Sequence, residues 1–289
     1  MGRLLAFYDR HYKTLLALSI VIFLLSIVFI AAHWLRTGQL FRLSVSLAGG
    51  STITLQLSQP IDALKLQAAL AAAFPEEDFS VKGLFTAGGY PAIVVESTAL
   101  ETEKLTAWLE QELSPASMST EVIGPALGAS FFRSAIRALI ITFVLMSVVM
   151  FIYFRQPLPA AYVVLAAIAD VLFAWAGTLA LGIPISTAGI AAFLMLIGYS
   201  VDTDVLLSAR VLRGEGVLNE RIAGAAKTGL TMTGTTLAAV TIALIIVPSE
   251  IVRQIMTVLL FGLIADLWNT WLLNAGLLRL YIEARHGTR

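Results

Sequence analysis

Four aspartates lie in stretches of this chain that are otherwise apolar enough to form membrane helices: Asp170, Asp202, Asp204 and Asp266. Insertion scales give a cost of at least ~2.5 kcal/mol for such a side chain at the centre of a bilayer, so these residues usually face the inside of a helix bundle and line an ion or substrate path. A carboxyl group that is shielded from water and lies near other carboxyls can take up and release a proton. The four aspartates therefore predict a proton relay or ion pathway.

A structural role is the alternative, because a permanently protonated aspartate can hydrogen-bond across helices and hold them together. Four such residues on three predicted helices that carry no Lys or Arg favour the relay, although Asp204, nearest to Arg210 and the membrane edge, stays open to both interpretations. Arg210 is included in the candidate pathway. On an ideal helix Asp202 and Asp204 point about 200° apart. We expect one of them to meet Asp170 or Asp266, and the other to face another helix, a partner subunit or water.

Small and hydroxylated residues accompany these aspartates. Gly198, Tyr199 and Ser200 come just before the Asp202 and Asp204 pair and would let a neighbouring backbone come close on one helix face. The fifth predicted helix is rich in Gly, Thr and Ala, which permit close approach and hydrogen bonds between membrane helices. Within it we single out Thr233 and Thr236 as possible neighbours of the relay.

The composition excludes several classes of protein. With 58% hydrophobic and 13% charged residues and a mean hydropathy of +0.86, the 289-residue chain is an integral membrane protein. Its 19 basic and 19 acidic residues leave no excess of positive charge to neutralise phosphates, which argues against a nucleic-acid partner. The sequence has no cysteine, no glycine-rich phosphate loop, no nucleophile elbow and no zinc-binding helix motif. We therefore expect no enzyme activity, no cofactor and no metal site.

Charged residues divide the apolar sequence into six segments long enough to cross a bilayer, which takes about 20 residues. Gly182 and Pro184 supply the break between the third and fourth segments. The predicted spans are 14–35, 138–154, 158–181, 186–207, 228–247 and 254–278.

The positive-inside rule sets the expected orientation. With the N-terminus inside, the short outer loops hold only Arg253, and both termini are cytoplasmic. The cytoplasmic side then receives Arg3, Arg10, Lys13, Arg155, Arg210, Arg213, Arg221, Lys227, Arg279, Arg285 and Arg289. The predicted organisation is a cytoplasmic N-terminus and first membrane helix (1–35), an extracytoplasmic domain (36–133), and a five-helix transmembrane bundle with a cytoplasmic C-terminus (134–289).

The extracytoplasmic segment shows both strand and helix periodicity. Its order is strand 51–57, helix 60–74, strands 79–85 and 92–95 joined across Gly88 and Gly89, helix 100–113 and strand 118–123. This order predicts an α+β domain with a ferredoxin-like fold. The adjacent acids Glu76, Glu77 and Asp78 have no calcium-loop spacing, so we interpret them as a solvated surface.

Several motifs together resemble the SecF members of the SecD/SecF family of protein-export membrane proteins. Asp202, Asp204 and the neighbouring Thr203 differ from the Asn, Asp, Thr pattern of bacterial members, and Ala169 and Ala209 stand where His and Asp are usual. The Asp, Thr, Asp arrangement, and the stretch around Asp266 and Asn269, are more similar to archaeal members. The motifs are 48–52 after the first helix, 123–128 before the second, 170–172 in the third, 197–204 followed by Arg210 in the fourth, and 231–237 in the fifth.

The resemblance implies six membrane helices, an extracytoplasmic ferredoxin-like domain and kinship with the proton-driven resistance, nodulation and division transporters. It also implies a SecD partner, the Sec translocation channel and a translocating polypeptide as partners, beside membrane lipid. Our leading hypothesis is a subunit that couples the proton motive force to late steps of protein translocation in the cell membrane. The alternatives are half of a proton-driven exporter of lipid or small molecules, and a membrane scaffold without transport.

Overall fold

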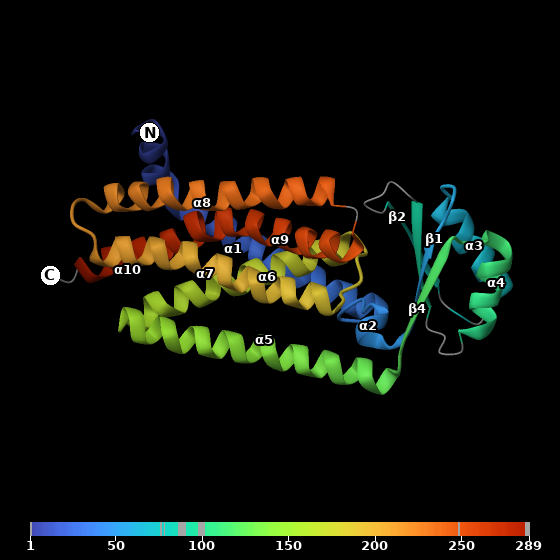
Figure 1. The fold of residues 1–289 in the computed structure, drawn as a ribbon. Coiled ribbons are helices and arrows are strands. Elements are labelled where there is room, and N and C mark those ends of the chain that lie inside the picture. Colours follow the sequence, from blue (N-terminus) through green and yellow to red (C-terminus); the bar gives the residue numbers. More distant parts are fainter. Residues whose placement is uncertain are drawn as a thin grey trace.

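Long apolar helices run side by side and carry a small α/β domain at one end (Figure 1). The computed structural model describes residues 2–75, 77, 79–85, 91–97, 102–247 and 249–286. In this part of the chain six helical spans are long and apolar enough to cross a membrane, as predicted. They are α1 (Gly2–Thr37), α5 (Pro125–Phe154), α6 (Pro157–Ala180), α7 (Thr187–Arg213), α8 (Leu218–Ile246), and a last span made of α9 (Glu250–Trp268), η1 (Asn269–Asn274) and α10 (Ala275–His286).

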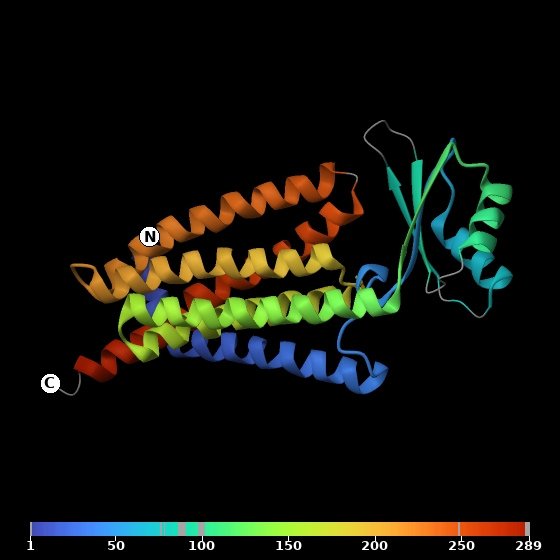
Figure 2. The same ribbon diagram turned by 60° about the horizontal axis from the view of Figure 1, so that its bottom comes forward.

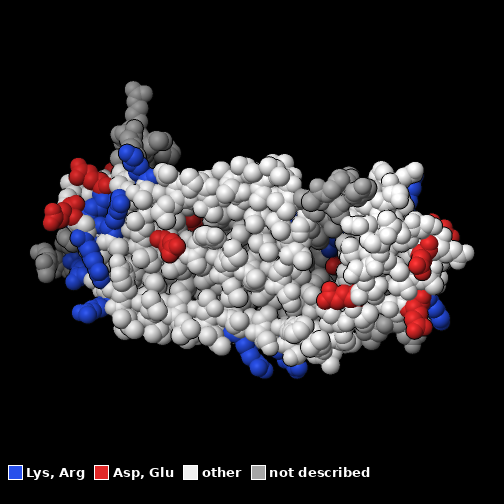
Figure 3. Space-filling model, viewed as in Figure 1, with Lys and Arg blue, Asp and Glu red and all other residues white. Residues whose placement is uncertain are grey.

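Two of these helices form the centre of the bundle. Half of the most apolar stretch of α6 and of α7 is buried, against 11% for α5 and 17% for α8, so α5 and α8 lie at the periphery. Both ribbon views place α7 between α5 and α8 (Figures 1 and 2). Many large apolar side chains of α1, α5 and α8 are exposed on the outside of the bundle. In the view of Figure 3 the middle of the molecule is largely free of charged residues. The bundle therefore has the surface that lipid requires.

The last span is not a continuous α-helix, although the sequence predicts one over 254–278. Six residues, Asn269–Asn274, form a π-helical turn in which hydrogen bonds join residues five apart. The second span also differs from its predicted limits, because α5 begins at Pro125, well before Ala138. Proline at the first helical position needs no hydrogen-bond donor and suits a helix start.

The α/β domain has the predicted order of strands and helices. Its sheet has the order β2-β3-β1-β4 with every neighbouring pair antiparallel, the ferredoxin-like arrangement. Leu55 on β1 and Leu109 on α4 are fully buried between the sheet and the two helices. The predicted turn at Gly88 and Gly89 lies outside the described residues, as do Glu76 and Asp78. The elements are β1 (Gly50–Gln56), α3 (Ala63–Ala73), β2 (Phe79–Phe85), β3 (Pro91–Ser97), α4 (Glu103–Leu113) and β4 (Ser117–Ile123).

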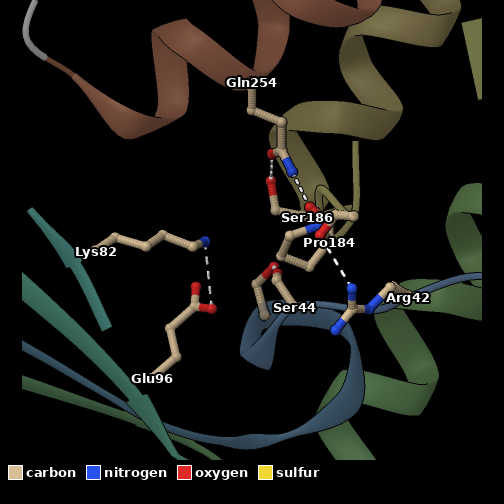
Figure 4. Close-up of polar contacts among 9 residues, drawn as sticks. Arg42, Ser44, Lys82, Glu96, Pro184, Ser186 and Gln254 are labelled. Atoms are coloured by element: carbon tan, nitrogen blue, oxygen red, sulfur yellow. Dashed lines mark hydrogen bonds and ion pairs between the residues drawn. The ribbon is translucent and has the colours of Figure 1, made fainter. Parts of the chain in front are cut away.

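The segment between α1 and β1 is fastened to the bundle rather than to the sheet. It contains the short helix α2 (Val45–Ala48), and just before it Leu43 forms a parallel bridge with Ile185 in the loop between α6 and α7. The Ile185 N–H donates to the Arg42 carbonyl at 2.6 Å, and Ser44 N–H donates to the Ile185 carbonyl at 3.0 Å. Gln254 at the start of α9 bonds to the same loop (Figure 4). These backbone and side-chain bonds, which we call the clasp, join the start of α2, the α6–α7 loop and α9.

Gly49 is the point at which β1 leaves this clasp, and it tolerates no side chain. Its φ is +89°, and a Cβ there would lie 2.6 Å from Cα of Pro125. We expect Gly49→Ala to lower the free energy of unfolding by about 2 kcal/mol, because the left-handed backbone and the backbone clash add. Gly124→Ala is the matched control, since nothing lies within 4 Å of its Cβ position. Thermal unfolding in detergent measures both; equal melting temperatures for the two variants would contradict this packing.

Candidate functional site

Three of the four aspartates meet inside the bundle. Asp170 on α6, Asp204 on α7 and Asp266 on α9 are each 0% exposed. They lie close enough for their charges to repel one another when more than one is ionised. Among the described residues no Lys, Arg or His bonds to any of the three carboxyls. The cluster is therefore held by neutral donors alone.

Asp170 is fixed by one donor on each carboxyl oxygen. The Ser200 hydroxyl on α7 donates to Oδ2 at 2.5 Å, and the Asn269 amide on η1 donates to Oδ1 at 2.7 Å. Both partners are buried. This carboxyl thus connects α6 with α7 and with the last span.

Asp266 accepts from three threonines. The hydroxyls of Thr203 and Thr270 donate to Oδ1 at 2.8 Å each, and the Thr233 hydroxyl on α8 donates to Oδ2 at 3.2 Å. Thr203 Oγ1 also lies 2.9 Å from the carbonyl oxygen of Ser200, the residue that bonds to Asp170. Ser200 and Thr203 occupy adjacent positions on one face of α7. Asp170 and Asp266 are therefore linked through this turn of α7.

Asp204 has an incomplete set of partners. The Asn274 amide donates to its Oδ1 at 2.8 Å, but neither Oδ2 of Asp204 nor Oδ1 of Asn274 has a hydrogen-bond partner among the described residues. The Thr270 hydroxyl, which donates to Asp266 at 2.8 Å, also lies beside Asp204. Buried polar atoms are rarely left unpaired. A proton on Oδ2 of Asp204 would turn that oxygen into a donor.

The π-helical turn supplies partners that the sequence analysis did not identify as site residues. Asn269, Thr270 and Asn274 all belong to η1 and are 2% exposed or less. Because π-helical hydrogen bonds join residues i and i+5, Asn269 and Asn274 fall on the same side and reach Asp170 and Asp204. The sequence feature that could have identified them is the presence of three polar residues, Asn269, Thr270 and Asn274, in an apolar span. Their spacing of i, i+1 and i+5 would not place them on one side of a regular α-helix.

The remaining predicted site residues lie outside this cluster. Arg210 donates to the Gly224 carbonyl at 2.6 Å and to the Thr228 hydroxyl at 3.2 Å, joining α7 to α8. Thr236 bonds to the Met232 carbonyl on its own helix. The structure thus brings Ser200 and Thr233 to the carboxyls but not Arg210 or Thr236.

Asp202 lies on the opposite face of α7. It is exposed, together with Ala191, Met195, Gly198 and Tyr199, which follow one another at helical spacing. A Cβ on Gly198 would have nothing within 4 Å. We call these five residues the open face of α7. The two aspartates of the pair thus divide as helix geometry requires, Asp204 inward and Asp202 outward.

Six apolar spans that enclose a cluster of buried carboxyls, with a ferredoxin-like domain at one end, define a class of polytopic membrane protein. A family model described as protein export membrane protein SecD/SecF, C-terminal, matches residues 103–284. The SecF proteins of Pyrococcus furiosus and Methanocaldococcus jannaschii are 37% and 36% identical to this chain, over 95% and 94% of it and 93% and 96% of their own length. The chain therefore belongs to the SecD/SecF family and is a protein-export membrane protein of the SecF type, as the sequence motifs predicted.

The same fold occurs in a solved structure. The crystal structure of SecDF, a translocon-associated membrane protein from Thermus thermophilus, matches 96% of this chain with a TM-score of 0.78 at 19% identity. This chain spans only 38% of that longer chain. A heavy metal efflux pump shares the fold more distantly, with a TM-score of 0.50 over 82% of the chain.

Proposed function

We propose that this chain couples the proton motive force to late steps of protein translocation, together with a SecD-like subunit and the Sec channel. The observation that carries the proposal is the cluster of Asp170, Asp204 and Asp266, which are fully buried and bond, among the described residues, to neutral side chains alone. In this arrangement both termini are cytoplasmic and the α/β domain is extracytoplasmic. Lys and Arg atoms gather at the end of the bundle opposite that domain, which supports this orientation (Figure 3).

The hydrogen bonds provide a route for a proton. A hydroxyl group both donates and accepts, so Thr270, which lies beside Asp204, and Thr203, whose hydroxyl oxygen is 3.4 Å from that of Thr270, can pass a proton to and from Asp266. Asp170 bonds to Ser200 in the same turn of α7 as Thr203, so a small movement of that turn would extend the route to Asp170. A proton that arrives at Asp204 meets a carboxyl oxygen, Oδ2, that has no hydrogen-bond partner among the described residues, as has Oδ1 of the neighbouring Asn274. Asp204 is in this way suited to be the site that holds the proton while Asp170 and Asp266 keep their donors.

Proton arrival would change the contacts between helices. When the proton moves on from Asp204 to Asp266, one oxygen of that carboxyl becomes a donor, so a threonine that donated to this oxygen must turn, and the bonds that join α7, α8 and the last span change with it. Near the start of the last span, the Gln254 side chain bonds to the loop that holds α2. One charge crossing 100 mV supplies about 2.3 kcal/mol, enough to bias the clasp and the attached α/β domain between two positions.

The exposed position of Asp202 supports the proposed SecD-like partner. A carboxyl group on the outside of a helix at bilayer depth is costly against lipid, and Asp202 is exposed on the open face of α7. A second membrane subunit that covers this face would remove the side chain from lipid. The SecDF chain, of which this protein matches 38%, is long enough to contain such a second unit.

Two threonines of α8 give a matched test. In vesicles that contain the chain, a SecD-like subunit and the Sec channel, Thr233→Val should lower proton uptake severalfold, because it removes a donor to Asp266. Thr236→Val should leave uptake unchanged, because the Thr236 hydroxyl bonds to the Met232 carbonyl of its own helix. Uptake is read from an internal pH dye under an imposed gradient, and export from protease protection of a secreted substrate. Proton uptake that is identical in the wild type and in vesicles without this chain would exclude the coupling.

A further inference from the structure

A polar cleft opens at the end of the bundle that lies opposite the α/β domain. It is formed by the turn that joins α5 to α6, the last turns of α7, the first turn of α8 and the helix α10, all of which reach that end in Figure 1. Its volume is about 230 Å³. Pockets that enclose drug-sized ligands measure about 300 to 1,000 Å³. The cleft therefore suits a small chemical group rather than a whole nucleotide or a peptide.

The polar lining of this cleft consists of cations and neutral hydrogen-bonding groups. Arg221 and Arg285 supply two guanidinium groups, Gln156 an amide and Tyr281 a hydroxyl, and the described residues that line the cleft include no Asp or Glu. The Tyr281 hydroxyl donates to Oε1 of Gln156 at 3.1 Å, which leaves the amide nitrogen of Gln156 to donate to a ligand. Guanidinium groups with additional N–H donors are the set that binds a phosphate.

Backbone carbonyls hold Arg221 in place. Its Nε donates to the Gly216 carbonyl at 3.0 Å, and its Nη1 donates to the Val211 carbonyl at 3.1 Å, in the last turn of α7 where carbonyls have no partner within the helix. These bonds fix the plane of the guanidinium group but use only part of its five N–H donors. A side chain that is already positioned loses less conformational entropy when a ligand binds. Arg221 is thus preorganised to bind an anion.

The cleft lies at the level at which the apolar spans end. Gln156 occupies the turn between the last residue of α5 and the first residue of α6, and tyrosines such as Tyr281 are enriched where a membrane meets water. Beside its polar groups the cleft is lined by the apolar side chains of Val211, Leu212 and Ile282. A ligand that matches both parts has a phosphate joined to an apolar group, which favours a lipid over a free phosphate ion. Basic pockets between helices at the surface of a membrane bind anionic lipid headgroups.

We propose that this cleft binds the phosphate headgroup of an anionic lipid. The phosphate accepts from the guanidinium groups of Arg221 and Arg285 and from the Gln156 amide, and the first atoms of the lipid chains lie against the apolar lining. The bound lipid joins the α5–α6 turn, α7, α8 and α10. Because α10 follows η1 directly, it also holds the helix next to Asn274. The site goes beyond the proposed function and does not depend on proton coupling or on a second subunit.

Lipid binding to the purified chain tests this site. The probe is phosphatidylglycerol, added to the full chain in neutral detergent, with bound lipid measured by native mass spectrometry and zwitterionic phosphatidylcholine as the comparison. We expect one phosphatidylglycerol per chain to bind about tenfold more tightly than phosphatidylcholine, as a contact between a net anion and two cations requires. Equal affinity for the two lipids would overturn the proposal. Inorganic phosphate that displaces the lipid at equal concentration would also overturn it and assign the cleft to a soluble anion.

Two substitutions in the cleft locate the bound lipid. Gln156→Glu keeps the oxygen that accepts from Tyr281 and should keep the melting temperature, but it places a negative charge beside the phosphate. Arg285→Gln removes a cation from the exposed end of α10. Each should weaken phosphatidylglycerol binding about tenfold. Gln111→Glu on the exposed surface of α4 is the matched control and should bind as the wild type does. Wild-type affinity in either folded cleft variant would overturn the proposal.

Discussion

Replacing Asp170 by asparagine is expected to abolish proton uptake and leave the fold intact. An asparagine at this position keeps an oxygen that accepts from the Asn269 amide and places an amide group where the Ser200 hydroxyl can accept. The buried hydrogen bonds are thus preserved, and the unfolding free energy should stay within about 1 kcal/mol of the wild type. What is lost is the group that exchanges a proton. Uptake in vesicles should fall to the level of vesicles without protein.

The leucine variant separates chemistry from structure. Asp170→Leu also removes the carboxyl, but it leaves the Ser200 hydroxyl and the Asn269 amide buried without their acceptor. Each unpaired group costs about 1 to 3 kcal/mol, so this variant should unfold at a markedly lower temperature. Glu112→Gln on the exposed surface of α4 is the control for loss of a carboxyl elsewhere. Full proton uptake by a folded Asp170→Asn variant would remove Asp170 from the relay.

Strong local patterns explain what could be predicted from the sequence. The apolar runs around α1 and α6 leave no alternative to membrane helices, and the alternation in Ile53 and Leu55 fixes which face of β1 is buried. Helix geometry alone separates Asp202 from Asp204. These features depend on residues within a few positions of one another, so the sequence contains the whole signal.

The composition of the cluster depends on contacts between distant segments. The rotation of α7 against α6 and α9 decides which of Asp202 and Asp204 points inward. The spacing of the two residues along the chain does not determine that rotation. Asn274 comes within reach of Asp204 only because the last span changes from α- to π-helical winding at Asn269. Arg210 looks like a charge partner in sequence, but its long side chain extends to Gly224 on α8. Such choices follow from packing, not from local preference.

The two aspartates of α7 should respond to leucine in opposite ways when the chain is studied alone. Asp202→Leu replaces an exposed polar side chain at membrane depth by an apolar one, so the isolated chain should gain stability in bilayer or bicelles, by up to about 3 kcal/mol. Asp204→Leu removes the acceptor of the buried Asn274 amide and should cost about 1 to 3 kcal/mol. Thermal unfolding of the two variants beside the wild type measures this difference in sign.

Association with the second subunit should reverse the gain at Asp202. If the open face of α7 is the contact surface, the partner presents a polar group to Asp202, and Asp202→Leu leaves that group without its counterpart in a dry interface. The variant that is more stable alone should therefore bind the SecD-like subunit more weakly and take up fewer protons in its presence. Asp202→Asn, which keeps a hydrogen-bonding side chain, should restore binding in large part. A leucine variant that binds as tightly as the wild type would place Asp202 against lipid or water, and the partner on another face of the bundle.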